Sequence, residues 1–292
     1  MPQVFVASRE WVAPLLAARA AGHDAAETSL DLGLTRVRLE VTEAGARLPD
    51  GSLLPWEALA EIDAAEQNCF ALDGGACAPI RVFSEATGRL CSLMPTSGAP
   101  TLLIAGIPMH RIKGVDPYQD TLNKMRAIGR LRGRVLDTST GLGYTAIEAA
   151  RSAEQVVTIE IDPAVLEVAR LNPWSRDLFQ RANITQITGD SYEEVAALPE
   201  ASFDAIIHDP PAMRLTGDLY SGEMYRRLYR VLRDGGRLFH YIGDPDSKSG
   251  RSVTRGVALR LEEAGFGEVR PRPQAFGLLA RKGGRGGGRR RR

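Results

Sequence analysis

The chain has 292 residues, more than the roughly 150 that make up one typical domain, so we expect two domains. Apolar residues account for 43% and charged residues for 25% of the sequence, which argues against an intrinsically disordered protein and against a membrane protein. The net charge of +1 hides an asymmetry, because the end of the chain from Arg281 is strongly basic while the remainder is acidic.

The first part of the chain, residues 1–114, predicts a small β-rich N-terminal domain. Residues 8–21 have a helical pattern, and apolar and charged residues then alternate over residues 35–41 as in a half-buried strand. A turn at residues 49–51, Pro-Asp-Gly, favours a hairpin there. Further short strands are expected where apolar runs are separated by Gly, Pro and Ser, at residues 80–83, 90–93 and 101–104.

Residues 115–282 predict a second domain of the α/β class, in which short apolar strands alternate with helices. The expected strands are residues 134–137, 156–160, 185–188, 205–208 and 237–241, with a final pair near 268–270 and 275–280. The expected helices are residues 145–153, 163–171, 221–232 and 252–264, with Gly235-Gly236 after the third as its stop. This order predicts a Rossmann-like, doubly wound and mostly parallel sheet.

The last ten residues, 283–292, read GGRGGGRRRR and are predicted to form a disordered basic tail. Such a tail either keeps the protein in solution or contacts nucleic acid without sequence preference, since clustered arginines release counterions from phosphates. The sequence leaves both interpretations open.

Several classes of protein are disfavoured by what the sequence lacks. Cys69, Cys77 and Cys91 are odd in number and have no C-x-x-C spacing, which supports neither a disulfide framework nor a zinc site. The longest apolar stretch is about half of the roughly 20 residues that a membrane span needs, and the N-terminus is a poor match to a secretion signal. We therefore expect a cytoplasmic protein with no metal and no membrane partner.

An apolar strand that runs into a glycine loop gives the strongest local signal, in the segment Val135-Leu136-Asp137-Thr138-Ser139-Thr140-Gly141-Leu142-Gly143. Gly141 and Gly143 lack a Cβ, so the backbone can turn sharply and approach a ligand, and the next helix adds free N–H groups. This loop alone predicts a nucleotide-like ligand and does not distinguish a dinucleotide from other adenosine compounds.

Two acids follow the glycine loop at the ends of the next two predicted strands. Glu160 lies nineteen residues after Gly141, where a carboxylate accepts hydrogen bonds from both hydroxyls of a ribose. Asp190 follows the third strand and is a candidate for an adenine amine, with a helix N-cap as the alternative. Asp162 is explained as a helix cap before Pro163, whereas no structural role is expected for Glu160.

On these residues the chain resembles the class I methyltransferases that use S-adenosylmethionine (SAM), over about 165 residues. The resemblance implies SAM as the cofactor, with Asp137 and the two glycines around its methionine part, Glu160 on the ribose and Asp190 at the adenine. Neighbouring candidates for cofactor binding are Tyr118, Gln119, Thr138, Tyr144, Thr145, Ile161 and Ser191. NAD fits less well, because its fingerprint brings the first glycine directly after the strand. The whole chain is also similar to a family of uncharacterised prokaryotic predicted methyltransferases, in residues 107–114, 136–145 and 169–174.

The predicted catalytic motif is Asp209-Pro210-Pro211, which follows the fourth strand of the second domain. It resembles the D/N-P-P-aromatic signature of methyltransferases that act on amino nitrogens, in which the polar side chain orients the nitrogen. Ala212 replaces the aromatic residue that stacks a flipped base, which weakens the case for a nucleobase. The methyl acceptor therefore stays open between RNA, protein and a small amine, and the oligomeric state is not indicated.

Two other functions remain as alternatives. The segment Leu219-Tyr220-Ser221-Gly222-Glu223-Met224-Tyr225 resembles spermidine synthases, which transfer an aminopropyl group from decarboxylated SAM and also place a small β domain first. The motif Asp209-Pro210-Pro211 stands where that family has an aspartate-rich loop. A non-catalytic module that binds SAM or RNA is the second alternative. His110, His208 and His240 lack the spacing of metal ligands and are expected to pack or to make hydrogen bonds.

Overall fold

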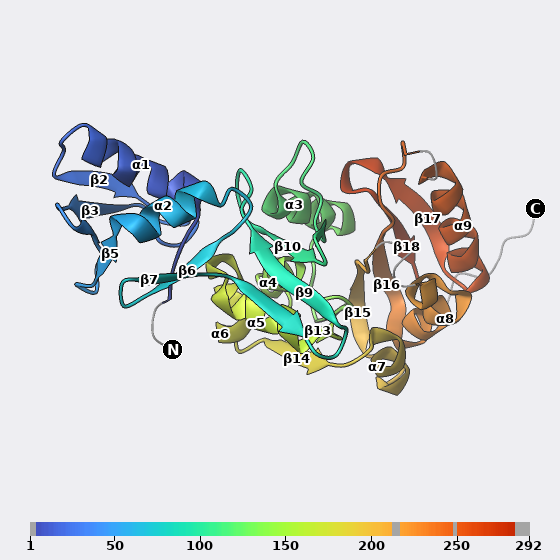
Figure 1. Cartoon of the computed structure of the whole chain (residues 1–292). Coiled ribbons are helices and arrows are strands. Elements are labelled where there is room, and N and C mark those ends of the chain that lie inside the picture. The colour runs from blue at the N-terminus through green and yellow to red at the C-terminus, as the bar shows by residue number, and fades with distance from the viewer. Residues whose placement is uncertain (1–3, 212–216, 248–249, 284–292) are drawn as a thin grey trace, which may run out of the picture. The chain divides into compact units, whose positions relative to one another are not determined.

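The computed structural model describes residues 4–211, 217–247 and 250–283, and the chain divides into two compact units. The first unit comprises Met1–Tyr118 and Pro163–Phe179, and the second comprises Gln119–Asp162 and Gln180–Arg292. Figure 1 labels most of the helices and strands, and its colours follow the residue number along the chain. A segment from the middle of the chain thus belongs to the first unit. The domain boundary near residue 114 stays a prediction, and the basic tail from residue 284 lies outside the described residues.

Three small antiparallel sheets make up most of the first unit, with strand orders β1-β6-β7, β2-β3-β4-β5 and β11-β10-β9-β8. Their strands are β1 (Phe5–Ala7), β2 (Ala25–Thr28), β3 (Val37–Val41), β4 (Gly45–Arg47), β5 (Leu53–Pro55), β6 (Phe70–Asp73), β7 (Ala76–Pro79), β8 (Arg81–Ser84), β9 (Arg89–Met94), β10 (Thr101–Ile104) and β11 (Ile107–Pro108). The helices are α1 (Arg9–Ala20), α2 (Trp56–Ala64), α5 (Pro163–Leu171) and the short η1 (Pro173–Ser175).

The core of the first unit lies between helices α1 and α2 and the neighbouring strands. Leu15 of α1 and Leu59 and Ile62 of α2 are buried with Leu54 and Phe70 in one hydrophobic cluster. In Figure 1, α1 and α2 lie beside β2, β3 and β5 in the blue part of the chain. Helix α5 packs on β8 and β9 of the same unit. Burial of these apolar side chains is the main force that holds such small sheets together.

Most of the elements predicted for this part are present. The helix at residues 8–21 is α1, and the strand at 35–41 is β3. The Pro-Asp-Gly turn at residues 49–51 joins β4 to β5, which pair antiparallel as a hairpin. Helix α2 and the hairpin of β6 and β7 were not predicted, although the apolar spacing of Trp56, Leu59 and Ile62 is helical.

A seven-stranded sheet forms the centre of the second unit, in the order β14-β13-β12-β15-β16-β18-β17. Its strands are β12 (Arg134–Asp137), β13 (Gln155–Glu160), β14 (Ile184–Thr188), β15 (Phe203–His208), β16 (Leu232–Tyr241), β17 (Gly267–Arg272) and β18 (Gly277–Arg281). Neighbouring strands from β14 through to β16 pair parallel, while β18 runs antiparallel to both β16 and β17. The chain order reverses between β12 and β15, which is the position where open α/β sheets bind ligands.

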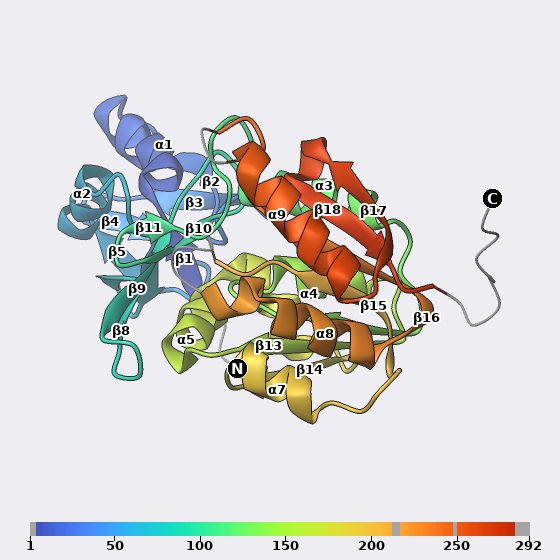
Figure 2. The same ribbon diagram turned by 90° about the vertical axis from the view of Figure 1, so that its right-hand side faces the viewer.

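Helix α3 (Pro117–Ile128) begins in the first unit and lies mostly in the second, whereas α6 (Arg176–Gln180) lies in the first unit except for its last residue. The other helices of the second unit are α4 (Tyr144–Ala150), α7 (Ser191–Ala197), α8 (Gly222–Val231) and α9 (Gly250–Glu263), with the short η2 (Gly217–Tyr220) and η3 (Pro273–Ala275). Helices α7, α8 and α9 lie next to one another (Figure 2). They contribute Val195, Leu228 and Leu261 to one buried cluster. Val135 and Leu136, successive residues of β12, are both fully buried, so both faces of the central strand are covered.

The predicted fold class is confirmed, since the second unit is a Rossmann-like, mostly parallel sheet with helices and the N-terminal part is β-rich. One detail was wrong. Strand β16 begins at Leu232, directly after α8, so Gly235 and Gly236 lie within a strand and do not form the helix stop. None of the helices in the described ranges is long and apolar enough to cross a membrane.

Helix α9 offers a matched pair of leucines that tests this packing. Leu261 is fully buried, whereas Leu259 is 50% exposed. We expect Leu261→Ala to lower the free energy of unfolding by about 2–5 kcal/mol, because it removes buried methyl groups and leaves a cavity. Leu259→Ala should change it by less than about 0.5 kcal/mol. Urea unfolding measures both, and equal effects would contradict the described orientation of α9.

Candidate active site

Three acidic residues stand at the carboxyl ends of the central strands of the second unit. Asp137 ends β12, Glu160 ends β13, and Asp209 directly follows β15. Strand β12 pairs with both of the others in parallel register, so the three ends meet at one edge of the sheet. In sheets of this kind, ligands bind beyond the carboxyl ends of the strands. The described structure therefore brings the main predicted site residues of this unit to one edge.

The side chain of Asp137 is fully buried, and only one of its two carboxylate oxygens accepts hydrogen bonds from the described residues. Its Oδ2 accepts hydrogen bonds from Thr158 Oγ1 at 3.0 Å and from Thr145 Oγ1 at 3.1 Å. Its Oδ1 has no hydrogen-bond partner within the described part of the chain. The pKa of Asp137 is raised to about 7, mainly by burial and also by the nearby charge of Asp209, against the lowering effect of the two threonine hydroxyls. A buried carboxylate oxygen in this state favours a cationic or proton-bearing partner.

The glycine loop adopts the conformation that the sequence predicted from its glycines. Gly141 and Gly143 have φ values of 52° and 78°, in the left-handed region that residues with a Cβ rarely adopt. Open space lies where a Cβ of Gly141 would stand, with no atom of the described chain within 4 Å. The loop thus leaves room for a ligand to approach the main chain, and α4 begins directly after it with Tyr144 and Thr145.

Glu160 has a structural role that was not expected. Its Oε2 accepts the N–H of Gly141 at 2.8 Å, and its Oε1 accepts the N–H of Asp162 at 3.1 Å. The carboxylate therefore ties the glycine loop to the end of β13. Burial raises the pKa of Glu160, and the two backbone N–H groups act in the opposite direction. Each carboxylate oxygen keeps a second lone pair, so both can still accept one more hydrogen bond.

Asp190, the acid predicted to reach the adenine, is exposed and caps helix α7. Its side chain accepts the N–H of Tyr192 at 2.8 Å. The structural alternative for this residue is thus realised, and its contact with adenine stays a prediction. The next residue, Ser191, is buried and donates its hydroxyl to the carbonyl of Thr138. This bond holds the start of α7 against the strand end that carries the glycine loop.

The remaining candidates lie in different environments. Ile161, directly after Glu160, is 56% exposed, which is unusual for an isoleucine beside a buried strand. Gln119 makes a hydrogen bond to Asn123 one turn further along α3. Tyr118 belongs to the first unit, where its ring lies 5.3 Å from that of Trp174. Nothing in these contacts assigns a ligand to any of the three.

Asp209 is held by a lysine that the sequence analysis did not single out. The Nζ of Lys124 lies 2.6 Å from Oδ2 of Asp209 and 3.1 Å from Oδ2 of Asp120, and the side chain of Lys124 is only 5% exposed. The ring centroid of Tyr241 lies 4.5 Å from the same Nζ. The i,i+4 spacing of Asp120 and Lys124 on α3 was a visible signal for the first pair. Pro210 is buried and Pro211 half-buried, while Ala212 lies outside the described residues.

Two buried histidines stand behind this edge of the sheet. His208 bonds through Nδ1 to Thr138 Oγ1 at 2.7 Å, and its Nε2 donates to the carbonyl of Leu219 at 2.8 Å. Burial lowers the pKa of His208 to about 4, so the ring is neutral at pH 7. His240 likewise bonds to the carbonyl of His208 and to the hydroxyl of Tyr225. Both act as hydrogen-bonded core residues, and no group of possible metal ligands occurs in the described ranges.

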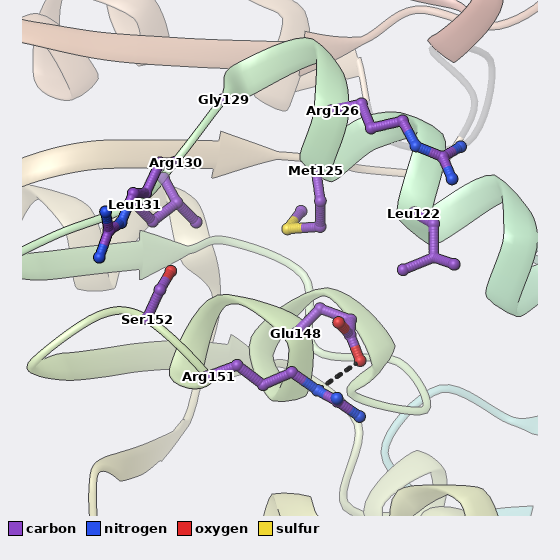
Figure 3. Close-up of a pocket in the computed structure, with 9 residues that line it drawn as sticks. All are labelled: Leu122, Met125, Arg126, Gly129, Arg130, Leu131, Glu148, Arg151 and Ser152. Atoms are coloured by element: carbon purple, nitrogen blue, oxygen red, sulfur yellow. Dashed lines mark ion pairs between the residues drawn. The ribbon is translucent and has the colours of Figure 1, made fainter.

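A groove of about 330 Å³ lies elsewhere in the second unit (Figure 3). It is lined by the ends of α3 and α4 and by the loop before β12, at the amino ends of the strands. Its lining residues are Leu122, Met125, Arg126, Gly129, Arg130, Leu131, Glu148, Arg151 and Ser152. Figure 3 shows the ion pair of Glu148 and Arg151, 2.9 Å long, on its α4 side. None of the predicted site residues lines this groove.

Comparisons with known proteins agree with the geometry of the second unit. A family model described as "Methyltransferase domain" matches residues 135–236. An uncharacterised protein of the archaeon Methanocaldococcus jannaschii is 40% identical over 260 residues, which cover 87% of this chain and 88% of that protein. The chain belongs to the class I SAM-dependent methyltransferases. It forms one family with the archaeal protein, and SAM is its cofactor, as the sequence predicted.

This methyltransferase is also similar to proteins with a different printed name. Polyamine aminopropyltransferase 2 of Streptomyces coelicolor is 32% identical over 160 residues, which cover 51% of this chain and 29% of that longer protein. A spermidine synthase solved with the transition-state analogue AdoDATO matches with a TM-score of 0.57 at 19% identity, covering 72% of this chain and 78% of that one. At this identity the structural likeness shows the shared fold alone.

The buried state of Asp137 predicts a pH dependence of stability in the SAM-free methyltransferase. Because its pKa is raised from 3.8 to about 7 in the folded protein, its contribution to stability is fully present below pH 4 and is lost as the pH rises through 7. The variant Asp137→Asn has no titrating carboxyl group at this position and therefore lacks this contribution to stability. The free energy of unfolding of the variant, relative to the unsubstituted protein, should therefore rise by about 1.4 kcal/mol per pH unit between pH 5 and 7 and then level off. Urea unfolding at several pH values measures the difference, and a constant difference would contradict the raised pKa.

Proposed function

We propose that this methyltransferase transfers the methyl group of SAM to an amino nitrogen. The observation that carries the proposal is the position of Asp209 at the same sheet edge as Asp137 and the glycine loop, with Oδ2 tied to Lys124. The described residues make no hydrogen bond to Oδ1 of Asp209, and its side chain is 19% exposed. One oxygen is thus left to accept an N–H from a substrate, as the motif Asp209-Pro210-Pro211 suggests.

The residues of the second unit fit SAM on three points. The orphaned Oδ1 of Asp137 suits the ammonium group of its methionine part. The open space at Gly141 admits a ligand against the main chain. Both oxygens of Glu160 retain a lone pair for the ribose hydroxyls. We assign the adenine to Asp190, whose second oxygen is not needed for the cap, and further cofactor contacts to Gln119, Thr138, Gly143, Tyr144, Thr145, Ile161 and Ser191 of the same unit.

The residues of the chain would assist methyl transfer mainly by positioning the acceptor nitrogen against the methyl group. Bound SAM supplies a methyl group that is activated by the positive sulfur. The acceptor nitrogen forms a bond to the methyl carbon while the carbon–sulfur bond breaks, and that electron pair remains on sulfur. Asp209 accepts an N–H of the acceptor, which aims the lone pair and favours loss of the proton as positive charge develops on nitrogen. Pro210 and Pro211 have no backbone N–H, so this segment presents acceptors and no competing donors.

Replacing Glu160 tests the cofactor site. We expect Glu160→Ala to weaken SAM binding by about 10- to 100-fold, because hydrogen bonds to a charged acceptor contribute about 1.5–3 kcal/mol. Isothermal titration calorimetry measures the dissociation constant. Glu154→Ala, an exposed glutamate just before the same strand, is the matched control and should bind SAM normally. Equal effects of the two substitutions would remove Glu160 from the site.

Replacing Asp209 tests the acceptor end. Asp209→Ala should lower methyl transfer by about 100-fold or more, the usual contribution of a positioned acid or base, and leave SAM affinity within about threefold. The assay incubates tritiated SAM with fractionated RNA, proteins and small amines from a cell extract, and then with whichever fraction accepts the label. Normal turnover of the variant would reassign the role of Asp209. Absence of any acceptor for the unsubstituted protein would favour a non-catalytic SAM-binding module.

Aminopropyl transfer from decarboxylated SAM is the second candidate, favoured by the 32% identity with a polyamine aminopropyltransferase. The two candidates differ in the ligand that stabilises the folded protein. A thermal shift assay with SAM and with decarboxylated SAM separates them, since a ligand raises the melting temperature according to its affinity for the native state. A larger shift with decarboxylated SAM would replace the first proposal by the second.

A further inference from the structure

Lys124 is an almost fully buried charged side chain that contacts the motif. It lies on α3, and its ammonium group contacts carboxylates of two different elements, Asp120 on the same helix and Asp209 after β15. The side chains of Lys124 and Asp120 are 5% and 1% exposed, so the pair is closed off from water. The ring of Tyr241, 4.5 Å away, covers another side of the ammonium group. The long side chain of Lys124 is therefore held in place by Asp120, Asp209 and Tyr241.

Electrostatics keep this lysine charged. Burial by itself lowers the pKa of Lys124, but the charges of Asp209 and Asp120 outweigh burial and raise the pKa above its ordinary value. A charged lysine between two carboxylates leaves one net negative charge in the cluster. A second carboxylate is more than a single buried ion pair requires, because Asp120 alone would neutralise the lysine. The bond to Asp209 is thus an additional one, and it reaches the residue that carries the proposed chemistry.

We propose that Lys124 is the positioning residue of the reaction, which holds Oδ2 of Asp209 and so leaves Oδ1 to accept the N–H of the methyl acceptor. The inference rests on the proposed function of Asp209. Asp120 and Tyr241 in turn hold Lys124, and they act on the acceptor only through it. A carboxylate on a short side chain rotates about two bonds, and one fixed oxygen removes most of that freedom. Pre-placed groups of this kind raise the rate because misplacement by about 1 Å can cost about 100-fold.

The test uses Lys124→Met and Lys124→Arg in the full chain, with Arg126→Met as the matched control. Arg126 is exposed on the same helix and bonds to Asn123. Lys124→Met leaves two buried carboxylates without a cation, so the double variant Asp120→Asn/Lys124→Met is made as well, which removes the pair together and keeps Asp209. Thermal unfolding and SAM titration identify the variants that are folded and bind the cofactor.

For a folded variant without Lys124, we expect kcat for the labelled acceptor to fall about 10- to 100-fold with the dissociation constant of SAM within threefold. Lys124→Arg should recover at least a third of the lost turnover, and Arg126→Met should retain it all. A general structural role would instead weaken SAM binding and turnover together and would not be rescued by arginine. Unchanged kcat in the double variant, or a parallel loss of SAM affinity, would overturn the proposal.

A crystal structure of the double variant provides a second test, for which the methyl acceptor need not be known. We expect the Asp209 carboxylate to occupy a different rotamer or several rotamers once Lys124 is absent. An unmoved, single conformation would overturn the positioning role whatever the kinetics. Should the unsubstituted protein methylate nothing, the proposed function fails on its own, while the position of the carboxylate still decides whether Lys124 fixes Asp209.

Discussion

The buried carboxylate of Asp137 is the constraint on which the structure depends at the carboxyl ends of the strands in the seven-stranded sheet. Desolvation of a carboxylate is costly, and here it is offset by hydroxyl groups from two elements, Thr145 on α4 and Thr158 on β13. These bonds fix the start of α4 and the neighbouring strand relative to β12. The unsatisfied Oδ1 shows that the compensation is incomplete in the protein alone. A ligand that donates a hydrogen bond to this oxygen would remove the deficit and stabilise the loop.

Glu160 and Asp190 both serve the fold and keep the capacity to accept further hydrogen bonds from a ligand. Glu160 closes the glycine loop onto β13 through Gly141, and Asp190 caps α7. Each uses only part of its capacity to accept hydrogen bonds. A choice between a structural and a functional explanation is therefore too narrow for carboxylates at strand ends. Under the proposed function, the same carboxylates that order the loop and the helix would also contact the cofactor.

Local patterns in the sequence were enough for the strands of the second unit, the glycine loop and the spacing to Glu160, because each depends on residues near one another in the chain. Lys124 was missed for the opposite reason, since its bond to Asp209 joins residues 85 positions apart. The start of β16 at Leu232 was missed because glycines usually end helices, and tertiary pairing with Phe203 of β15 overrode that preference. The inclusion of α5 in the first unit follows from its packing on β8 and β9, which no local spacing encodes.

Hydrogen bonds of the buried His208 tie the glycine loop to the segment beyond the motif. Thr138, at the base of the glycine loop, bonds to His208, and His208 donates to the carbonyl of Leu219 in η2. The ring of His240 lies 4.5 Å from that of His208, so two positive rings would repel each other. Burial lowers the pKa of both, and neutrality lets each ring donate at one nitrogen and accept at the other. A neutral histidine can therefore accept a hydrogen bond from a hydroxyl at one ring nitrogen and donate one to a carbonyl at the other, which lysine and arginine, as donors only, cannot do.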